Sequence, residues 1–399
     1  MRIAVVTSQY PVPADPTRGR PVLQTIEALA RLVSLEVFVP NARYPAWLSP
    51  RSYRYIDAVP HRDSKGSSIV HYLSYPSVPL LGRITNGYAV ARSLEGPLKA
   101  YAPDLILAYW LYPDAFGAGL VARAMKVPLV VGARGSDIRA RDRLSLAYTR
   151  RVLAHSDHVL TVSDDLQRIA AESFAVPPNR ISTVRNGCDT SIFSLGDRSA
   201  ARAGLGLPDG RLVLYVGRLV AAKGLLELLE AWMQLAAADP SLRLAFVGEG
   251  GLREELFRRA RARGFSDRVL LPGISAPAQV AEWMRACDVM CLPSYSEGFP
   301  NVLIEALACG RPIVATPVGG IREIVDRENG LFVPVRNVDL LATALRESME
   351  RTWDEAALSR RYARSWDDVA RETFDACKSA VGISDPASTA DPWKSRTTS

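Results

Sequence analysis

Short, almost continuously apolar runs alternate with longer amphipathic segments along nearly the whole chain. Runs such as residues 3–7 and 105–108 lack the polar alternation of half-exposed strands, so they are typical of strands buried on both faces of a parallel sheet. The segments between them, such as residues 83–101, have the apolar spacing of helices that cover a sheet. This order of elements predicts an α/β fold in which helices connect parallel strands. The other strands expected in the first half are residues 35–39, 69–73, 129–132, 158–162 and 181–184.

The same rhythm begins again near residue 212, after a segment rich in glycine, aspartate, serine and proline. That composition marks a linker, here residues 196–209. Two series of this length predict two doubly wound, Rossmann-like parallel-sheet domains that face a cleft, formed by residues 1–195 and 210–360. Residues 384–399 are polar and rich in serine, threonine and proline, so we expect them to form a disordered tail.

Composition excludes several classes of protein. With 399 residues, of which 48% are hydrophobic and 23% charged, the chain can bury a large core, so it is neither a disordered protein nor a disulfide-stapled miniprotein. No stretch reaches the roughly 18 uncharged apolar residues of a membrane span, and the first apolar run is too short for a signal peptide. The five cysteines include no C-x-x-C pair, which favours buried thiols in a reducing compartment. We therefore expect a soluble cytoplasmic protein.

The positive charge of the chain is confined to its first half. The net charge is 49 − 42 = +7; residues 1–199 hold 24 basic and 16 acidic side chains, and the remainder holds 25 and 26. This asymmetry indicates an anionic partner for the first half, such as a phosphate-bearing substrate, a membrane surface or nucleic acid. A solvated, arginine-rich surface is the alternative.

Neither half carries the glycine fingerprint of a dinucleotide-binding domain. The first predicted strand leads into residues 7–13 without the G-x-G-x-x-G spacing, and so does the strand before Gly217. The glycine-rich residues 248–251 also lack it. Binding of NAD in the usual manner, and with it a dehydrogenase, is therefore disfavoured.

The segment at residues 294–310 is the strongest candidate for a ligand site. A helix is expected to begin near Asn301 and to end at Gly310, a residue type common just after helices. The free amides and the positive dipole end of such a helix start can bind a phosphate. Glu305 could then accept hydrogen bonds from two ribose hydroxyls, and Glu297 could reach hydroxyls of a sugar. Two ordinary surface glutamates near a helix start are the alternative.

A second segment, residues 217–224, places Gly217 at the carboxyl end of a predicted strand, where ligands bind in open α/β sheets. Arg218 and Lys223 follow in the loop before the next helix. Two cations so placed can clamp a diphosphate, on which charge accumulates as it departs. Two solvated loop cations are the alternative, but the two segments lie in the same domain, which favours a joint function.

These two segments resemble the retaining glycosyltransferases of family 4, which have the GT-B fold. The E-x7-E element of that family matches Glu297 and Glu305, and its Arg…Lys pair matches Arg218 and Lys223. The resemblance covers nearly the whole chain. It implies a nucleotide-sugar donor in the second domain, an acceptor in the first, no required metal and no cofactor, and a final helix at residues 361–383 that crosses back to the first domain. Further similar positions are residues 163–164, 186–189, 316–320, Phe193 and Trp366.

The chain departs from the family at residues 133–137, where many members have H-G-x-D. Arg134 stands in the place of the histidine, before Gly135 and Asp137. A guanidinium cannot act as a base near neutral pH, so no histidine-assisted step is expected. We expect Arg134 to contact a phosphate or to steer the acceptor, and Asp137 to orient the loop.

The acceptor side is specified by fewer residues. The resemblance implies that the first loop, residues 10–21 with Gly19, helps to position the acceptor and the donor phosphate. The arginines of residues 134–151, with the aromatic residues of 109–112, would suit a lipid-diphosphate acceptor at an anionic bilayer face. A solvated helix face is the alternative. Nucleic acid is not expected as a partner, because no recognised binding motif accompanies the charge.

The sequence therefore predicts a retaining, metal-independent glycosyltransferase that moves a sugar from a nucleotide-diphosphate sugar to a glycan or lipid-linked acceptor, in cell-envelope or exopolysaccharide biosynthesis. It would act in the cytoplasm and contact the inner face of the membrane peripherally. A sugar-nucleotide epimerase or hydrolase with the same fold, or a catalytically silent nucleotide-sugar-binding protein, are the alternatives. The expected catalytic residues are Arg218, Lys223 and Glu297; the expected donor-binding residues are Gly217, Gly298, Phe299, Glu305 and, through their amides, Asn301, Val302 and Leu303; the expected acceptor-side residues are Gly19, Arg134 and Asp137.

Overall fold

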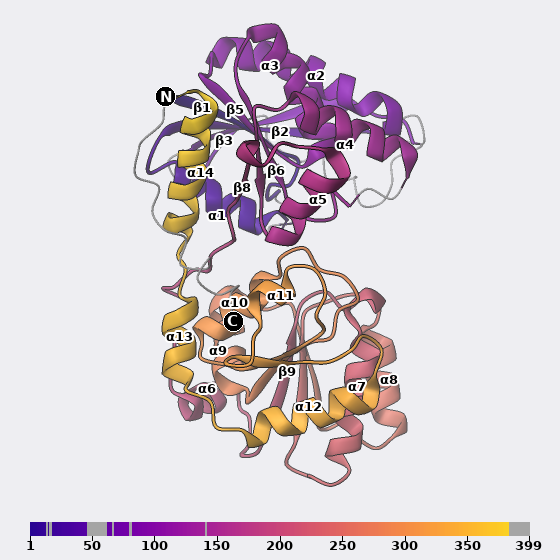
Figure 1. Ribbon diagram of the computed structural model, residues 1–399. Coiled ribbons are helices and arrows are strands. Elements are labelled where there is room, and N and C mark those ends of the chain that lie inside the picture. Colours follow the sequence, from indigo (N-terminus) through magenta and orange to yellow (C-terminus); the bar gives the residue numbers. More distant parts are fainter. Residues whose placement is uncertain are drawn as a thin grey trace.

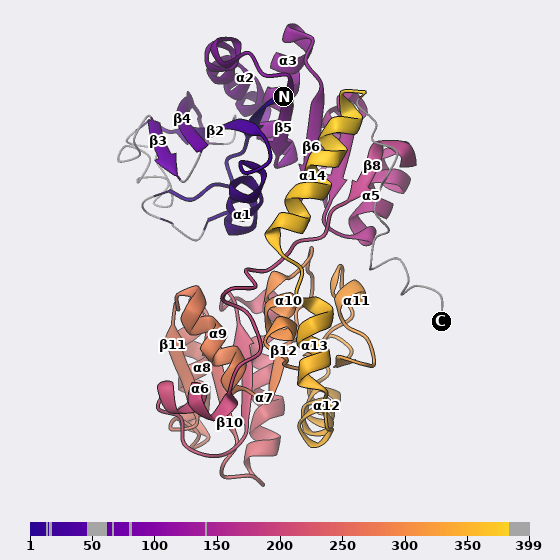
Figure 2. The ribbon, with the colours of Figure 1, turned by 90° about the vertical axis from the view of Figure 1, so that its left-hand side faces the viewer.

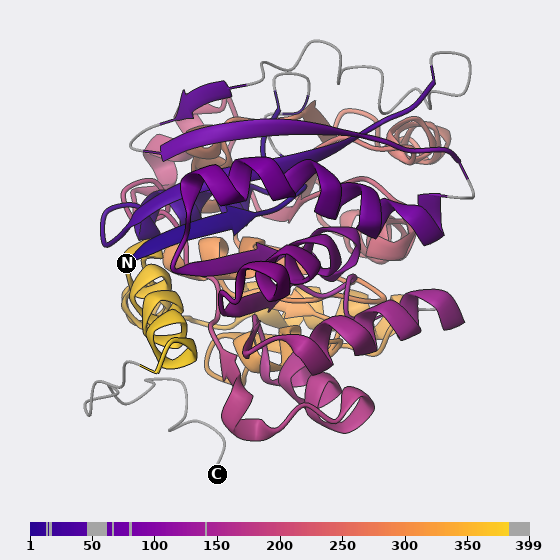
Figure 3. The ribbon, with the colours of Figure 1, turned by 90° about the horizontal axis from the view of Figure 1, so that it is seen from above.

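Two α/β domains, each built on its own sheet, lie one above the other (Figure 1). The computed structural model describes residues 1–12, 15, 18–45, 62–65, 68–79, 82–139 and 142–382, without the side chains of residues 62–65. The predicted disordered tail, residues 384–399, lies outside the described residues, as does part of the first loop. Seen from above, the pink to orange second domain lies beneath the first (Figure 3).

The first domain contains an eight-stranded sheet in the order β3-β4-β2-β1-β5-β6-β7-β8. All of its described neighbours pair in parallel except β3, which pairs antiparallel with β4 at the sheet edge. The strands were expected from their apolar runs, but the polar sequence of β3 gave no such signal. The strands are β1 (Arg2–Val6), β2 (Ser34–Arg43), β3 (Arg62–Lys65), β4 (Ser68–Pro76), β5 (Leu105–Tyr109), β6 (Leu129–Ala133), β7 (His158–Thr161) and β8 (Ile181–Thr183).

Helices cover both faces of the first sheet. Alternate residues of β1 enter different apolar clusters: Ala4 and Val6 join the cluster under α2 and α3, whereas Ile3 and Val5 join the cluster under α1 and α14. This is the two-sided burial that the continuous apolar strands predicted. The helical elements are α1 (Arg20–Leu29), α2 (Gly82–Tyr101), the short π-helix η3 (Leu111–Ala115), α3 (Phe116–Met125), α4 (Arg143–His155), α5 (Asp164–Phe174) and the 3-10 turn η4 (Pro178–Arg180).

The second domain contains a six-stranded, fully parallel sheet in the order β11-β10-β9-β12-β13-β14. The chain winds outward from β9 in one direction and from β12 in the other, so the crevice between the carboxyl ends of these two strands is the expected ligand site. The strands are β9 (Leu212–Val216), β10 (Arg243–Val247), β11 (Val269–Gly273), β12 (Val289–Leu292), β13 (Ile313–Ala315) and β14 (Gly330–Phe332).

Helices connect the strands of the second domain, and the helix expected near Asn301 is among them. In particular, α10 begins at Asn301, and Gly310 has a left-handed φ of 77° just after its end, as its sequence predicted. The helices are the 3-10 turn η5 (Ala221–Lys223), α7 (Leu225–Ala236), α8 (Arg253–Ala262), α9 (Pro277–Ala286), α10 (Asn301–Ala308), α11 (Ile321–Ile324), α12 (Val338–Glu350) and α13 (Glu355–Tyr362).

The segment predicted as a linker contains a helix. α6 (Arg198–Gly204) begins with Asp197, whose side chain accepts a hydrogen bond from the Ala200 amide. Ala201 and Arg202 are buried, and the Arg202 guanidinium donates to the carbonyl oxygen of Ala286 in α9. The segment therefore packs onto the second domain.

The last described helix, α14 (Trp366–Ala380), leaves the second domain and lies against the first (Figure 2). A capping box formed by Ser365 and Asp368 begins it. Its buried residues Val369, Ala370 and Cys377 share an apolar cluster with α1. This is the arrangement that the resemblance implied for residues 361–383.

All five cysteines are free and buried, as predicted. Among the described residues, no helix has the length and apolar character needed to cross a membrane.

Candidate active site

An ion pair lies at the crevice between the carboxyl ends of β9 and β12. The Lys223 ammonium, which follows β9, lies 2.5 Å from Oε1 of Glu297, which follows β12. The two side chains are only 19% and 11% exposed, so water screens their attraction incompletely. The sequence placed both residues in one site but did not foresee that they pair with each other.

The Glu297 carboxylate is held by a second donor. Ser294 Oγ donates to the same oxygen at 2.6 Å. The carbonyl oxygen of Ser294 accepts in turn from the hydroxyl of Thr316, at 2.5 Å, in the loop after β13. These contacts join three neighbouring strand ends, and they fix the carboxylate at the crevice.

Gly217 and Arg218 lie on the other side of the crevice, directly after β9. The Gly217 amide donates to the Val247 carbonyl at the end of β10, and the Arg218 carbonyl accepts from the Tyr215 hydroxyl. The Arg218 side chain is exposed and forms no ion pair with the described residues. Glu297 and Arg218 both act on the Tyr215 hydroxyl, whose pKa is raised chiefly by burial and further by Glu297. Of the two predicted cations, Lys223 is thus paired with Glu297, whereas Arg218 forms no ion pair with the described residues.

At the start of α10, two of the three predicted amides have no acceptor within their own helix. Asn301 and Val302 occupy the first two helical positions, where an amide has no acceptor within its own helix. The Leu303 amide instead donates to the Pro300 carbonyl at 3.1 Å. The Leu303 amide thus differs from the other two, and its contact with a phosphate stays a prediction.

Glu305, one turn further along α10, is half-buried and has a raised pKa of about 7. Desolvation by burial is the main cause, and the positive charge of Arg20 at the start of α1 opposes it. A carboxylate in a partly desolvated site accepts hydrogen bonds strongly once it is ionised. The position suits the predicted ribose contact.

A cavity of about 290 Å³ joins the two domains at this site. It is bordered from the second domain by Phe299 and Asn301, and from the first by Gly19 and Arg134. The acceptor-side and donor-side residues that were predicted separately therefore meet around one space. Gln9, Pro21, Val22, Tyr109, Trp110 and Asn186 complete its wall.

Two polar atoms in the wall of this cavity have no hydrogen-bond partner among the described residues. One is Nη2 of Arg134, whose guanidinium carbon lies 5.3 Å from the centre of the Tyr109 ring. The other is Oδ1 of Asn186, a residue only 5% exposed. Asn186 uses its amide nitrogen to donate to Oδ1 of Asn301, at 2.7 Å across the domain boundary. A buried donor and a buried acceptor without partners are expected where a ligand binds.

The remaining acceptor-side residues shape the backbone. Asp137 accepts hydrogen bonds from the amides of Arg134 and Gly135, so it orients the loop as predicted. Gly19 has φ 60°, and a Cβ atom there would lie 2.0 Å from the Gln9 carbonyl oxygen. No larger residue fits that position without a shift of the backbone.

The two domains touch directly beside the site. A Cβ atom on Gly135 would lie 3.1 Å from Cα of Gly298, so these loops approach each other closely. Glu323 of α11 accepts hydrogen bonds from the amides of Asp164 and Asp165 at 2.9 and 3.0 Å, and an ion pair joins it to Arg185. A carboxylate of the second domain thus caps α5 of the first. Sequence reasoning missed Glu323, because nothing in its own neighbourhood distinguishes it from an ordinary helical glutamate.

Comparison with known families agrees with this geometry. Residues 197–366 match the family described as "Glycosyl transferases group 1", and residues 19–187 match the family described as "Glycosyl transferase 4-like domain". The two matches correspond to the second and the first domain. The match to the group 1 family ends at residue 366, where α14 begins.

Two relatives are similar to the chain over most of their length. It is 28% identical to TuaC of Bacillus subtilis, whose name assigns it provisionally to teichuronic acid biosynthesis as a glycosyltransferase, over 96% of this chain and 97% of TuaC. It is 32% identical to the D-inositol 3-phosphate glycosyltransferase of Stackebrandtia nassauensis, over 88% of this chain and 82% of that protein.

Solved structures confirm the expected GT-B fold. HepE of Anabaena, in complex with UDP, superposes with a TM-score of 0.73 at 20% identity, over 95% of this chain and 100% of HepE. Sucrose-phosphate synthase from Thermosynechococcus elongatus has a TM-score of 0.69 at 22% identity, over 96% of each chain. Because the family matches cover both domains and the relative from Stackebrandtia nassauensis is 32% identical over 88% of this chain, the chain belongs to the group 1 glycosyltransferases.

Proposed function

We propose that the protein transfers a sugar from a nucleoside-diphosphate sugar to a glycan or lipid-linked acceptor, with retention of the anomeric configuration and without a metal ion. The observation that carries the proposal is the pairing of Lys223 with Glu297 at the β9–β12 crevice, beside the anion-binding start of α10. The name of TuaC assigns it provisionally to teichuronic acid biosynthesis, which supports a cell-envelope or exopolysaccharide role for this chain.

Two cations act on the leaving group. Arg218 is free to bind the diphosphate, and Lys223 can turn to it from Glu297. As the glycosidic bond breaks, negative charge accumulates on the diphosphate, and fixed positive charge stabilises it at that moment. The amides of Asn301 and Val302 bind the same group from the helix start. This set of groups supplies the charge stabilisation that a metal ion supplies in other transferases.

The two glutamates bind the hydroxyl groups of the donor. Glu297, once Lys223 turns to the diphosphate, keeps its contact with Ser294 and accepts from hydroxyls of the transferred sugar. Glu305 accepts from the ribose hydroxyls. A sugar held from one face by Glu297 stays in place while its bond to the diphosphate breaks.

Retention follows from the proton balance at the site. Arg134, which borders the cavity, cannot accept a proton near neutral pH. An oxygen of the departing diphosphate can take the proton of the acceptor hydroxyl, which then attacks from the same face that the diphosphate leaves. The C–O bond to the diphosphate breaks, the C–O bond to the acceptor forms, and the proton ends on the diphosphate.

The acceptor side favours a substrate held at an anionic membrane on its cytoplasmic face. Arg143, Arg150 and Arg151 of α4 are exposed, and so are the apolar side chains of Ile84 and Tyr88 on α2. Cations beside apolar groups suit peripheral contact with anionic lipid. Co-sedimentation with phosphatidylglycerol vesicles, but not with phosphatidylcholine vesicles, would support this contact.

Thermal stabilisation by a nucleotide panel of UDP, GDP, ADP, CMP and NAD is the first experiment. One nucleoside diphosphate is expected to raise the melting temperature of the wild type but not that of Glu305→Ala. At 100 times its Kd, such a ligand adds about 2.7 kcal/mol to the free energy of unfolding. NMR of the product formed from the matching nucleotide sugar then shows the anomeric configuration, and added EDTA tests the need for a metal. Release of free sugar alone would indicate a hydrolase, and no shift with any nucleotide would contradict the donor site.

A further inference from the structure

A second pocket lies in the first domain and shares no lining residue with the cavity between the domains. Its volume is about 210 Å³. Three of its residues follow strand ends: Tyr44 directly after β2, Ser77 directly after β4, and Tyr112 three residues after β5. Because β2 and β4 pair in parallel with the rest of the sheet, the pocket opens at the same carboxyl edge as the candidate active site. Tyr112 lies two residues from Trp110, which borders the interdomain cavity.

Two oxygen atoms in this pocket have no hydrogen-bond partner among the described residues. They are Oγ of Ser77, a residue only 2% exposed, and Oδ1 of Asn86 in the second turn of α2. Both lie beside Gly82: a Cβ atom there would be 2.7 Å from Ser77 Oγ and 2.8 Å from Asn86 Oδ1. Leaving a buried hydroxyl and a buried amide oxygen without partners costs free energy, and a ligand with hydroxyl groups would satisfy both.

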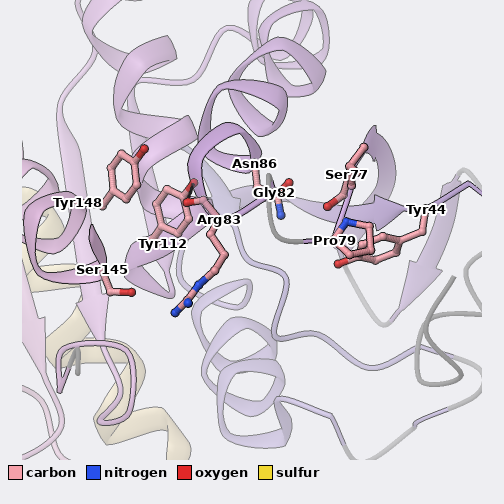
Figure 4. Close-up of a pocket in the computed structure, with 10 residues that line it drawn as sticks. Tyr44, Ser77, Pro79, Gly82, Arg83, Asn86, Tyr112, Ser145 and Tyr148 are labelled. Carbon is pink, nitrogen blue, oxygen red and sulfur yellow. Dashed lines mark hydrogen bonds between the residues drawn. The ribbon is translucent and has the colours of Figure 1, made fainter. Parts of the chain in front are cut away.

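Aromatic rings form one side of the pocket. The rings of Tyr112 and Tyr148 stack with their centres 4.4 Å apart and an angle of 11° between their planes. Their hydroxyls donate to the backbone carbonyls of Arg83 and Ile84, which fixes both rings. Figure 4 shows this pair on one side of the pocket and Tyr44 on the other. Rigid aromatic rings suit the C–H face of a sugar ring, which is weakly positive and apolar.

The charges around the pocket favour a neutral ligand. Arg83 is the one charged side chain among the described residues that line it, and its guanidinium already pairs with Asp142 at 2.8 Å. Both orphan atoms are oxygens; the Asn86 carbonyl oxygen can only accept, so it would repel a phosphate. The volume is below the roughly 300 Å³ at which pockets for drug-sized ligands begin, so it suits one ring and not a longer chain.

We propose that this pocket binds one neutral pyranose unit of the acceptor, with Ser77 and Asn86 hydrogen-bonding its hydroxyls and the tyrosines packing on its ring. The inference rests on the proposed function, since it takes the acceptor to carry a sugar. It separates acceptor recognition from the reacting centre: the pocket selects which sugar the acceptor presents, and the interdomain cavity holds the atoms that react.

Saturation-transfer difference NMR of the full-length protein tests this pocket. The probes are the methyl pyranosides of glucose, galactose, mannose and N-acetylglucosamine, each at about 10 mM, where millimolar affinities are detected. At least one of them is expected to receive saturation, most strongly on ring protons of one face. The double variant Ser77→Ala/Asn86→Ala is expected to bind that glycoside about thirtyfold more weakly, as the loss of two hydrogen bonds implies.

Matched controls separate this inference from the proposed function. Arg92→Ala lies on the exposed side of α2 and is expected to bind the glycoside like the wild type. Equal glycoside binding by the double variant and by Arg92→Ala would overturn the pocket, and so would an absence of saturation for all four glycosides in a protein that a nucleotide stabilises. Displacement of the glycoside by inorganic phosphate would show an anion site instead. Failure of every nucleotide to stabilise the wild type would refute the proposed function, whatever the glycosides do.

Discussion

Glu305 is expected to make nucleotide binding depend on pH. Burial raises the pKa of its carboxyl from 4.5 to about 7, although Arg20 acts in the opposite direction. In the proposed function two ribose hydroxyls donate to this group, and protonation removes one of its acceptor sites. The affinity for the donor should therefore follow the ionised fraction of Glu305.

The size of the effect follows from that pKa. With a pKa of about 7, about 91% of Glu305 is ionised at pH 8 and about 9% at pH 6, so the Kd is expected to be about tenfold higher at pH 6. Calorimetry with the nucleotide sugar measures this directly and avoids free nucleoside diphosphate, whose terminal phosphate titrates near pH 6. Glu305→Gln, which cannot titrate, is the control. An equal dependence on pH in both proteins would refute the role of Glu305.

The same group predicts how the unliganded protein responds to pH. Below about pH 4.5 Glu305 is protonated in both the folded and the unfolded chain. As the pH rises to about 7, the unfolded chain loses this proton first, so the folded state is destabilised across this window by at most about 3 kcal/mol. The partial exposure of the side chain makes this an upper limit. Glu305→Gln should thus melt higher than the wild type at pH 8 and at the same temperature at pH 4.5.

Three further substitutions test other parts of the site. Lys223→Ala should lower the turnover by about 10²-fold while circular dichroism shows a folded protein, and near-normal turnover would remove the diphosphate clamp. Glu323→Ala removes the carboxylate by which the second domain caps α5 of the first. Small-angle X-ray scattering should therefore give this variant a larger radius of gyration than Arg322→Ala, a control at the exposed neighbouring residue. Equal radii would show that other contacts hold the domains together. Gly19→Ala places a Cβ atom 2.0 Å from the Gln9 carbonyl oxygen at φ 60°, so its stability should fall by about 1–3 kcal/mol in a denaturant titration, and an unchanged midpoint would show that the loop adapts.

The architecture could be predicted because its signals are local. Strands buried on both faces leave continuous apolar runs, and their alternation with helices allows few topologies. The short strand β3 was not predicted, because its residues are polar and it pairs only at the sheet edge. The helix α6 was not predicted, because the residues around it are rich in glycine and proline and its stability comes from packing on α9.

The candidate site could be predicted only in part, because a sequence shows local signals but not contacts between distant segments. Lys223 and Glu297 were predicted to act together because their segments lie in one domain and resemble elements of one family. The structure adds the geometric reason, since both loops leave adjacent strands at the β9–β12 crevice. Contacts between distant segments were not visible: Glu323 at the start of α5, and Ser77 beside Asn86 in the pocket of the first domain. Acceptor recognition belongs to this second class, which explains why the sequence specified the donor side in more detail.

The pairing of Lys223 with Glu297 implies a selection between donor and product. In the structure the two groups lie 2.5 Å apart and satisfy each other. A free nucleoside diphosphate draws Lys223 away and leaves Glu297 with Ser294 alone, whereas a nucleotide sugar also offers hydroxyls to Glu297. Glu297→Gln removes the charge that is left unpaired when Lys223 turns to a free diphosphate. The ratio of the Kd of the free nucleoside diphosphate to the Kd of the nucleotide sugar should therefore fall by about tenfold in this variant. An unchanged ratio would mean that Lys223 binds phosphate without leaving Glu297, and the site would then hold its product as firmly as its substrate.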